Sequence, residues 1–126
     1  MLPARASRSK LVVVVDDDRL VLEAMAGLLR SWGFAVVTAA SERAAVELLA
    51  DEPSPPDLIL CDYRLAPGST GFAAIERLRG GSDIPAVIIT ADPTADLLRE
   101  GDTRDIRVLA KPVTPARLRR LLRELL

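Results

Sequence analysis

Acidic residues follow two apolar segments of the chain. Asp16, Asp17 and Asp18 come directly after a β-branched run at 10–15, and Asp62 follows another apolar run. Carboxylates that lie within hydrogen-bonding reach of one another repel and need a cation, and an all-oxygen ligand set favours a hard ion such as Mg²⁺. The pattern therefore predicts a Mg²⁺ site, provided that the fold brings the two segments together.

Two further polar residues, Thr90 and Lys111, follow later apolar runs. If Asp62 carries a phosphoryl group, a lysine ammonium can neutralise the added charge and a threonine hydroxyl can donate a hydrogen bond to it. Lysine is rare in this chain, which has only Lys10 and Lys111 against fifteen arginines. The residue types therefore suit phosphoryl transfer that uses neither histidine nor cysteine.

Apolar strands and helical patterns alternate along the chain. Strands are predicted at 10–15, 34–38, 57–61, 84–89 and 106–110, and helices at 19–32, 41–50, 71–78, 93–100 and from 114–115 onward. The helix at 93–100 is expected to be short and weak. Strict alternation predicts an α/β domain, a parallel sheet with helices on both faces, because each crossover is right-handed and helical. At this length we expect the flavodoxin-like, doubly wound (βα)5 fold with strand order 2-1-3-4-5.

The predicted strand order determines which polar residues meet. Ligands of doubly wound sheets bind beyond the carboxyl ends of the strands, where the strand order reverses. Asp16, Asp62, Thr90 and Lys111 each follow a strand, and the first and third strands are neighbours in this order. Each residue alone is more typical of a turn or a helix cap. Their joint occurrence at four of five strand ends favours a functional site.

Composition limits the class of protein. The chain has 126 residues, 49% of them hydrophobic, and a net charge of -1, which predicts one globular domain without a nucleic-acid-binding surface. Cys61 is the only cysteine and there is no histidine, so an intrachain disulfide and histidine catalysis are excluded. No apolar run approaches the roughly 20 residues that span a bilayer. We expect a cytoplasmic protein that binds no membrane through this domain, with a flexible arm at 1–9 and one domain at 10–126.

These motifs, in this order, resemble the receiver family of response regulators of two-component signalling, over 10–126. The matching stretches are VVVVDDD, LILCDYRL, IIT and AKP, which begin at positions 12, 58, 88 and 110. The resemblance implies that Asp62 is the phosphoacceptor in a Mg²⁺-dependent reaction. It implies that Thr90 is the switch hydroxyl and that Lys111 contacts the phosphoryl group.

The resemblance also implies metal ligands and partners. Asp16, Asp17, Asp62 and the main-chain carbonyl of Arg64 would bind the Mg²⁺. The phosphoryl donor would be a phosphohistidine on a histidine kinase or a histidine phosphotransfer protein, in cis or in trans. The acyl phosphate would later hydrolyse with some self-catalysis, and a homodimer would be compatible with the family.

Three features differ from the commonest family pattern, and a fourth follows it. The loop after Asp62, DYRLAPGSTGF, is one residue longer and is similar to that of receivers at the C-terminus of hybrid histidine kinases. Val108 stands where many members carry an aromatic residue that moves inward on activation, so we expect another route of readout. Pro93 predicts a stunted fourth helix. The Lys111–Pro112 bond is expected to be cis, as in many members.

Four alternatives fit some of the same residues. A stand-alone single-domain response regulator would share the whole site, and a receiver used only for docking would not need all its acidic residues. A haloacid-dehalogenase-like phosphatase would use Asp16 and Asp18 in a D-x-D-x-[TV] motif, but Leu20 stands at its last position. A nucleotide-binding flavodoxin-like domain would need a glycine-rich turn after the first strand, which this sequence lacks. The last helix also carries four arginines that we expect to form a solvated face, with partner docking as the alternative: Arg117, Arg119, Arg120 and Arg123.

Overall fold

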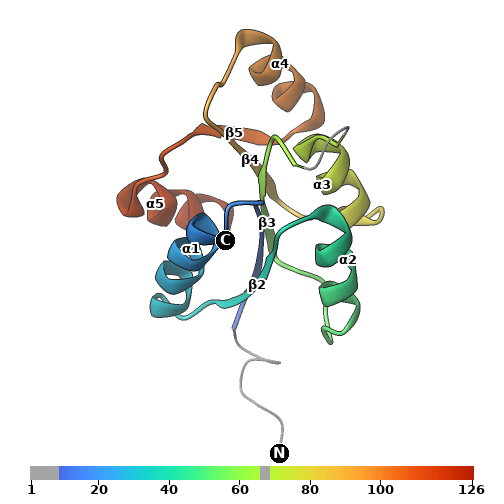
Figure 1. The fold of residues 1–126 in the computed structure, drawn as a ribbon, viewed down its shortest axis with the longest axis vertical. Helices are drawn as coiled ribbons and strands as arrows, with labels where there is room; N and C mark the ends of the chain where they lie inside the picture. Colours follow the sequence, from blue (N-terminus) through green and yellow to red (C-terminus); the bar gives the residue numbers. More distant parts are fainter. Residues whose placement is uncertain (1–8, 66–68) are drawn as a thin grey trace, which may run out of the picture.

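The computed structural model describes residues 9–65 and 69–126 and contains five strands and five helices that alternate (Figure 1). The strands are β1 (Leu11–Val15), β2 (Ala35–Ala39), β3 (Leu58–Asp62), β4 (Ala86–Thr90) and β5 (Arg107–Ala110). The helices are α1 (Arg19–Ser31), α2 (Glu42–Ala50), α3 (Gly71–Arg79), α4 (Ala95–Arg104) and α5 (Pro115–Leu125). The element order confirms the alternation predicted from the sequence.

All strands of the sheet are parallel, in the order β2-β1-β3-β4-β5. Figure 1 shows α1 and α5 on one face of the sheet and α2 and α3 on the other, with α4 beside β5. The predicted flavodoxin-like (βα)5 fold with order 2-1-3-4-5 is confirmed. As a result, β1 and β3 lie side by side at the point where the strand order reverses.

Two apolar cores explain why the central strands are continuous hydrophobic runs. Alternate residues of β1 point to opposite faces of the sheet, so Val13 and Val15 pack under α2 and α3 while Val12 and Val14 pack under α1 and α5. The largest fully buried side chain, Phe72 of α3, belongs to the first of these cores. Both faces of the central strands are therefore covered, and this fixes the carboxyl ends of those strands.

Each helix begins at a polar cap that the sequence encodes. The side chains of Asp18, Ser41, Thr70, Thr94 and Thr114 accept hydrogen bonds from backbone N–H groups of the first turn of α1 to α5, respectively. Such caps satisfy N–H groups that have no partner within the helix. They start every helix just after the loop that follows its strand.

The fourth helix differs from its prediction. α4 has ten residues, Ala95–Arg104, and is not the stunted segment expected at 93–100. Thr94 caps its start, and Asp105 ends it in the left-handed conformation with a φ of 57°. Leu97 and Gly101 are buried against the rest of the domain. Packing and capping therefore compensate for a sequence with weak helix propensity.

Other differences are small. The predicted strand boundaries shift by one or two residues, and Asp62 is the last residue of β3 instead of the first residue after it. Four large apolar side chains of the helices are exposed, namely Leu20, Val46, Leu48 and Leu98. The predicted flexible arm lies, apart from Ser9, outside the described residues, as do 66–68 of the longer loop.

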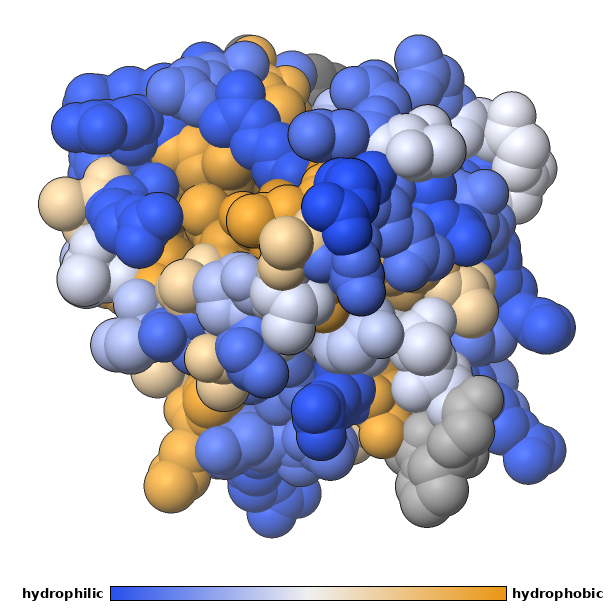
Figure 2. Space-filling view, turned by 90° about the horizontal axis from the view of Figure 1, so that it is seen from above, coloured by the Kyte–Doolittle hydropathy of each residue, from blue (hydrophilic) through white to orange (hydrophobic). Residues whose placement is uncertain are grey.

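Surface character varies around the domain. Figure 2 shows the molecule from above, with hydrophilic side chains over most of this face and an apolar area on its left, the side of α5 in Figure 1. β5 is an edge strand whose last three residues are only half-buried. Among the described helices, none is long and apolar enough to cross a membrane.

Candidate functional site

The structure brings the predicted site residues to one edge of the sheet. Asp16 follows β1, Asp62 and Thr90 are the last residues of β3 and β4, and Lys111 follows β5. In the strand register, Val15 of β1 pairs with the residue before Asp62. The site therefore lies at the point where strand order reverses, as the sequence predicted.

Three carboxylates form the acidic part of the site. One oxygen each from Asp16, Asp17 and Asp62 lie within 4.8 Å of one another. Asp16 and Asp62 are buried, whereas Asp17 is exposed. Asp18 does not join this group, because its side chain caps α1. Three clustered carboxylates with all-oxygen donors, one of them open to solvent, fit a Mg²⁺ ion that keeps some of its waters.

Backbone contacts orient these acids. One oxygen of Asp16 accepts a hydrogen bond of 2.8 Å from the backbone N–H of Asp18. The turn between β1 and α1 thus holds Asp16 inward while Asp18 serves the helix. The family resemblance already assigned Asp16 and Asp17, but not Asp18, to the metal; the structure adds that Asp18 caps α1, a role typical of the last residue of such a run.

Lys111 connects two of the acids. Its ammonium nitrogen lies 3.1 Å from an oxygen of Asp16 and 3.2 Å from an oxygen of Asp62. Burial lowers the pKa of Lys111, but its hydrogen bonds and charge interactions with Asp16 and Asp62 outweigh that effect and raise the pKa. The lysine is therefore held as a cation at the site. The Lys111–Pro112 peptide bond is cis, which confirms the expectation from the sequence.

The environment of Asp62 disfavours its charged form. Burial raises the pKa of Asp62, and the charge of Asp16 raises it further, while Lys111 partly offsets both. The neighbouring thiol of Cys61 is fully buried, and burial raises its pKa to about 12. Cys61 thus acts as a small apolar residue beneath the site.

Thr90 is buried at the end of β4. Its hydroxyl oxygen accepts a hydrogen bond of 3.2 Å from the backbone N–H of Asp92, so the hydroxyl proton stays available for donation. The next residue, Ala91, is small and exposed. The strand register pairs Asp62 with Ile89, directly before Thr90.

A close approach beneath the site requires glycine at position 71. A Cβ there would lie 2.5 Å from the carbonyl oxygen of Asp62 and 2.5 Å from a methyl group of Ile88. The backbone N–H of Gly71 also donates to the carbonyl of Tyr63 at 2.7 Å. No local sequence pattern indicates this requirement, because the approach of α3 to β3 is a tertiary feature.

Two aromatic side chains, Tyr63 and Phe72, lie in contact between the site and α4. Tyr63 follows Asp62 and meets the ring of Phe72 edge-on, with centroids 6.0 Å apart. The guanidinium of Arg104, at the end of α4, lies 5.3 Å from the centroid of Phe72. Val108 of β5 packs closely against α4. A Cβ added to Gly101 of α4 would lie 2.9 Å from a methyl group of Val108.

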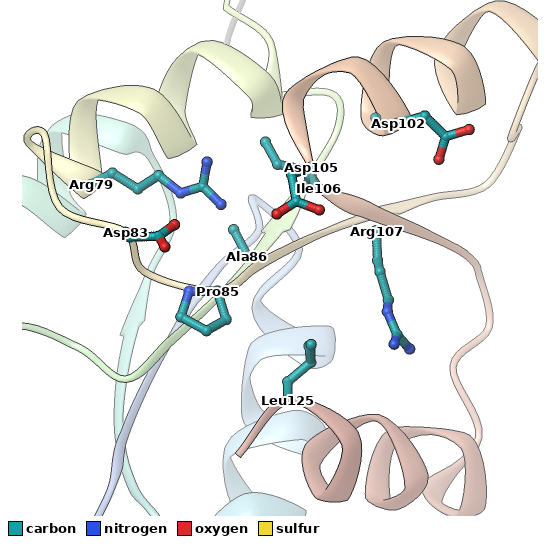
Figure 3. A pocket seen from close by; sticks show the side chains of 10 residues that line it. Arg79, Asp83, Pro85, Ala86, Asp102, Asp105, Ile106, Arg107 and Leu125 are labelled. Carbon is teal, nitrogen blue, oxygen red and sulfur yellow. The ribbon is translucent and has the colours of Figure 1, made fainter.

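A cavity elsewhere does not belong to this site. It has a volume of about 380 Å³ and lies where β4 and β5 begin, at the opposite edge of the sheet. Figure 3 shows that its polar lining includes Arg79, Asp83, Asp102 and Asp105. None of the predicted site residues lines it.

A flavodoxin-like domain with clustered carboxylates, a lysine and a threonine at its switch point belongs to the class of phosphoryl-accepting signalling domains. A family model described as the response regulator receiver domain matches residues 12–123. The chain therefore belongs to the receiver domain family of two-component signalling. Membership implies a phosphodonor partner such as a histidine kinase.

Similar proteins agree with this assignment. The two-component response regulator ORR11 of Oryza sativa subsp. indica is 36% identical over 117 residues, which cover 87% of this chain and 76% of that protein. The phyllosphere-induced regulator PhyR of Methylorubrum extorquens is 31% identical over 105 residues, which cover 83% of this chain but 39% of PhyR. The chain thus spans about two fifths of that relative. The solved structure of chemotaxis protein CheY4 of Vibrio cholerae has a TM-score of 0.83 at 26% identity, covering 94% of this chain and 100% of that one.

Proposed function

We propose that Asp62 accepts a phosphoryl group from a phosphohistidine on a partner and later releases it as inorganic phosphate. The observation that carries the proposal is the contact of 3.2 Å between Lys111 and Asp62 within a cluster of three carboxylates at the switch point. A lysine held against a buried aspartate at this position is suited to phosphoryl chemistry.

The reaction uses few groups of the chain. A carboxylate oxygen of Asp62 forms a bond to phosphorus while the bond from phosphorus to the histidine nitrogen breaks. The electron pair of the broken bond stays on that nitrogen, and the imidazole remains on the partner. Lys111 neutralises charge on the transferred group, and the hydroxyl of Thr90 donates a hydrogen bond to one of its oxygens. In hydrolysis, water attacks phosphorus and the Asp62 carboxylate is the leaving group.

We propose that Asp16, Asp17, Asp62 and the main-chain carbonyl of Arg64 bind the Mg²⁺. When bound, the ion supplies charge neutralisation for the acids and for the phosphoryl oxygens. Support comes from the mutual proximity of the three carboxylates and from the pKa of Asp62, which burial and, after it, the charge of Asp16 raise.

We also propose the context of the domain. The phosphoryl donor is a histidine kinase or a histidine phosphotransfer protein in the cytoplasm, and 10–126 forms the receiver domain. The longer loop after Asp62 favours a receiver of a hybrid histidine kinase over a stand-alone regulator. A homodimer is compatible with this proposal, and analytical ultracentrifugation tests whether one forms.

The decisive experiment labels the protein with acetyl phosphate and Mg²⁺. We expect a mass increase of one phosphoryl group that hydroxylamine removes, because an acyl phosphate is labile to it. Asp62→Asn should lose the label, whereas Asp83→Asn, an exposed aspartate outside the site, should keep it. Label on the Asp62→Asn variant would contradict the proposal, and label mapped to Asp16 would favour the phosphatase alternative.

A further inference from the structure

A second recess lies at the edge of the sheet opposite to Asp62, where the strands begin. We call it the basal recess and define it by seven residues: Lys10, Trp32, Phe34, Arg119, Leu122, Arg123 and Leu126. It has a volume of about 310 Å³ and lies between the end of α1, the residues that precede β1 and β2, and the second half of α5. None of its residues belongs to the phosphorylation site.

The floor of the basal recess is apolar. Leu122 is buried, and Trp32, Phe34 and Leu126 are half-buried, so their side chains remain partly open to the surface. Trp32 is the only tryptophan of the chain. Trp side chains dominate binding energy when a partner covers them, because they offer a large apolar area with few rotatable bonds.

The rim of the basal recess is cationic. Lys10, Arg119 and Arg123 are all exposed, and within the described part of the chain no carboxylate forms an ion pair with any of them. The one acid beside them on α5, Glu124, is paired with Arg107 instead. The recess is thus locally basic on a chain whose net charge is -1.

One rim cation is already positioned. The guanidinium of Arg119 lies 5.2 Å from the centroid of the Trp32 ring. This cation–π contact holds Arg119 over the floor and reduces the side-chain entropy that binding would cost. The arrangement therefore presents a fixed donor next to an apolar surface.

From this combination we propose that the basal recess binds an acidic peptide segment of a partner protein, with one bulky apolar side chain flanked by aspartate or glutamate residues. The recess is at the small end of the roughly 300–1,000 Å³ of ligand pockets, which is room for one anchoring side chain. The cations come from two separate segments, Lys10 just before β1 and the arginines of α5, so they need carboxylates on both sides of the anchor. Opposite charges around an apolar anchor supply both specificity and a faster encounter.

Binding is measured through Trp32 itself. The probes are four capped peptides, each with three glutamates on either side of a central Leu, Ile, Met or Phe, titrated up to about 1 mM, the weak limit of specific association. We expect at least one to change Trp32 emission saturably. The matched control peptides replace every glutamate with lysine, or the central residue with glycine, and should not bind.

Variants then test the rim. Lys10→Glu and Arg123→Glu should each weaken peptide binding by about tenfold or more. In the native protein, raising NaCl from about 50 to 500 mM should also weaken peptide binding. Arg120→Glu makes the same charge change on the same helix at an exposed position outside the recess, so it should alter affinity less than about twofold. Labelling of Asp62 by acetyl phosphate should be unchanged in all three variants, which separates this proposal from the function of Asp62.

Five results would overturn the proposal. The first three are no saturable change with any glutamate peptide, equal binding of the glycine-centred peptides, and equal effects of Arg120→Glu and Arg123→Glu. The fourth is quenching of Trp32 by phosphatidylserine vesicles but by none of the peptides, which would assign the basal recess to a membrane surface. A concentration-dependent dimer that Arg123→Glu dissociates would assign the recess to a second copy of the chain, and would equally contradict a partner peptide.

Discussion

The ammonium nitrogen of Lys111 lies 3.2 Å from a carboxylate oxygen of Asp62. It is also within 3.1 Å of Asp16, so one cation offsets the repulsion between two buried acids. Lys111 and Mg²⁺ then act on the same carboxylates, and removing the lysine should change the behaviour of both the metal and the phosphoryl group.

Replacing Lys111 with methionine should separate these two roles. The loss of a positive charge beside Asp16 and Asp62 leaves the acids more negative, so Mg²⁺ should bind about two- to tenfold more tightly by calorimetry. The rate of labelling by acetyl phosphate should fall by about tenfold or more, because the transferred group loses a cation. Lys10→Met, at the other end of the sheet, should change neither quantity. Weaker Mg²⁺ binding in Lys111→Met would contradict this account of the site.

The stability of the domain should depend on the charge of Asp62. Burial and the charge of Asp16 raise the pKa of Asp62 in the folded state. A raised folded-state pKa gives stability that is complete below the unfolded-state pKa and is lost as the pH rises through the folded-state pKa. At neutral pH in EDTA, Asp62→Asn should therefore have a higher urea midpoint than the native protein. The difference should shrink as the pH approaches about 4, the pKa of Asp in an unfolded chain. Equal urea midpoints of the two proteins at every pH would show that the charged carboxylate of Asp62 does not destabilise the folded state.

The site could be predicted from the sequence because its geometry follows from topology. Parallel strands place their carboxyl ends at one edge, so Asp16, Asp62, Thr90 and Lys111 had to meet once the strand order was assigned. Within the aspartate run, the resemblance indicated Asp16 and Asp17 as ligands, but the role of Asp18 as a helix cap was not assigned from the sequence. Asp16 faces the site and Asp18 caps α1 because of the turn between β1 and α1.

Features that depend on tertiary contact could not be read from the sequence. The sequence of α4 has weak helix propensity, and its actual length depends on the Thr94 cap and on burial of Leu97. The exposure of Leu20 was not predicted, since helical spacing alone does not say which edge of an apolar face meets solvent. The need for glycine at 71 arises from the carbonyl of Asp62, a contact that no local pattern encodes.

Two helical glycines should respond to alanine in opposite directions. At Gly101 a Cβ would lie 2.6 Å from the carbonyl oxygen of Ile106 and 2.9 Å from a methyl group of Val108, so Gly101→Ala should lower the free energy of unfolding by about 1–3 kcal/mol. At Gly27, in the interior of α1, a Cβ would meet nothing within 4 Å. Gly27→Ala should raise that free energy by about 0.5–1 kcal/mol through helix propensity. Urea denaturation measures both, and a Gly101→Ala variant as stable as the native protein would refute the close packing of α4 on β5.

The two ends of the sheet should report different ligands through different fluorophores. Tyr63 follows Asp62, whereas Trp32 lies beyond the opposite edge, separated from it by the length of a five-residue strand, about 15 Å. Mg²⁺ should leave the emission of Trp32 unchanged and should change that of Tyr63, the only tyrosine, once Trp32→Phe removes the stronger signal. Because Mg²⁺ binding needs its carboxylates, Asp16→Asn in the Trp32→Phe background should abolish the Tyr63 response. A Mg²⁺ response of Trp32 that survives Asp16→Asn would place a metal at the wrong end of the sheet and contradict the assignment of the carboxylate cluster.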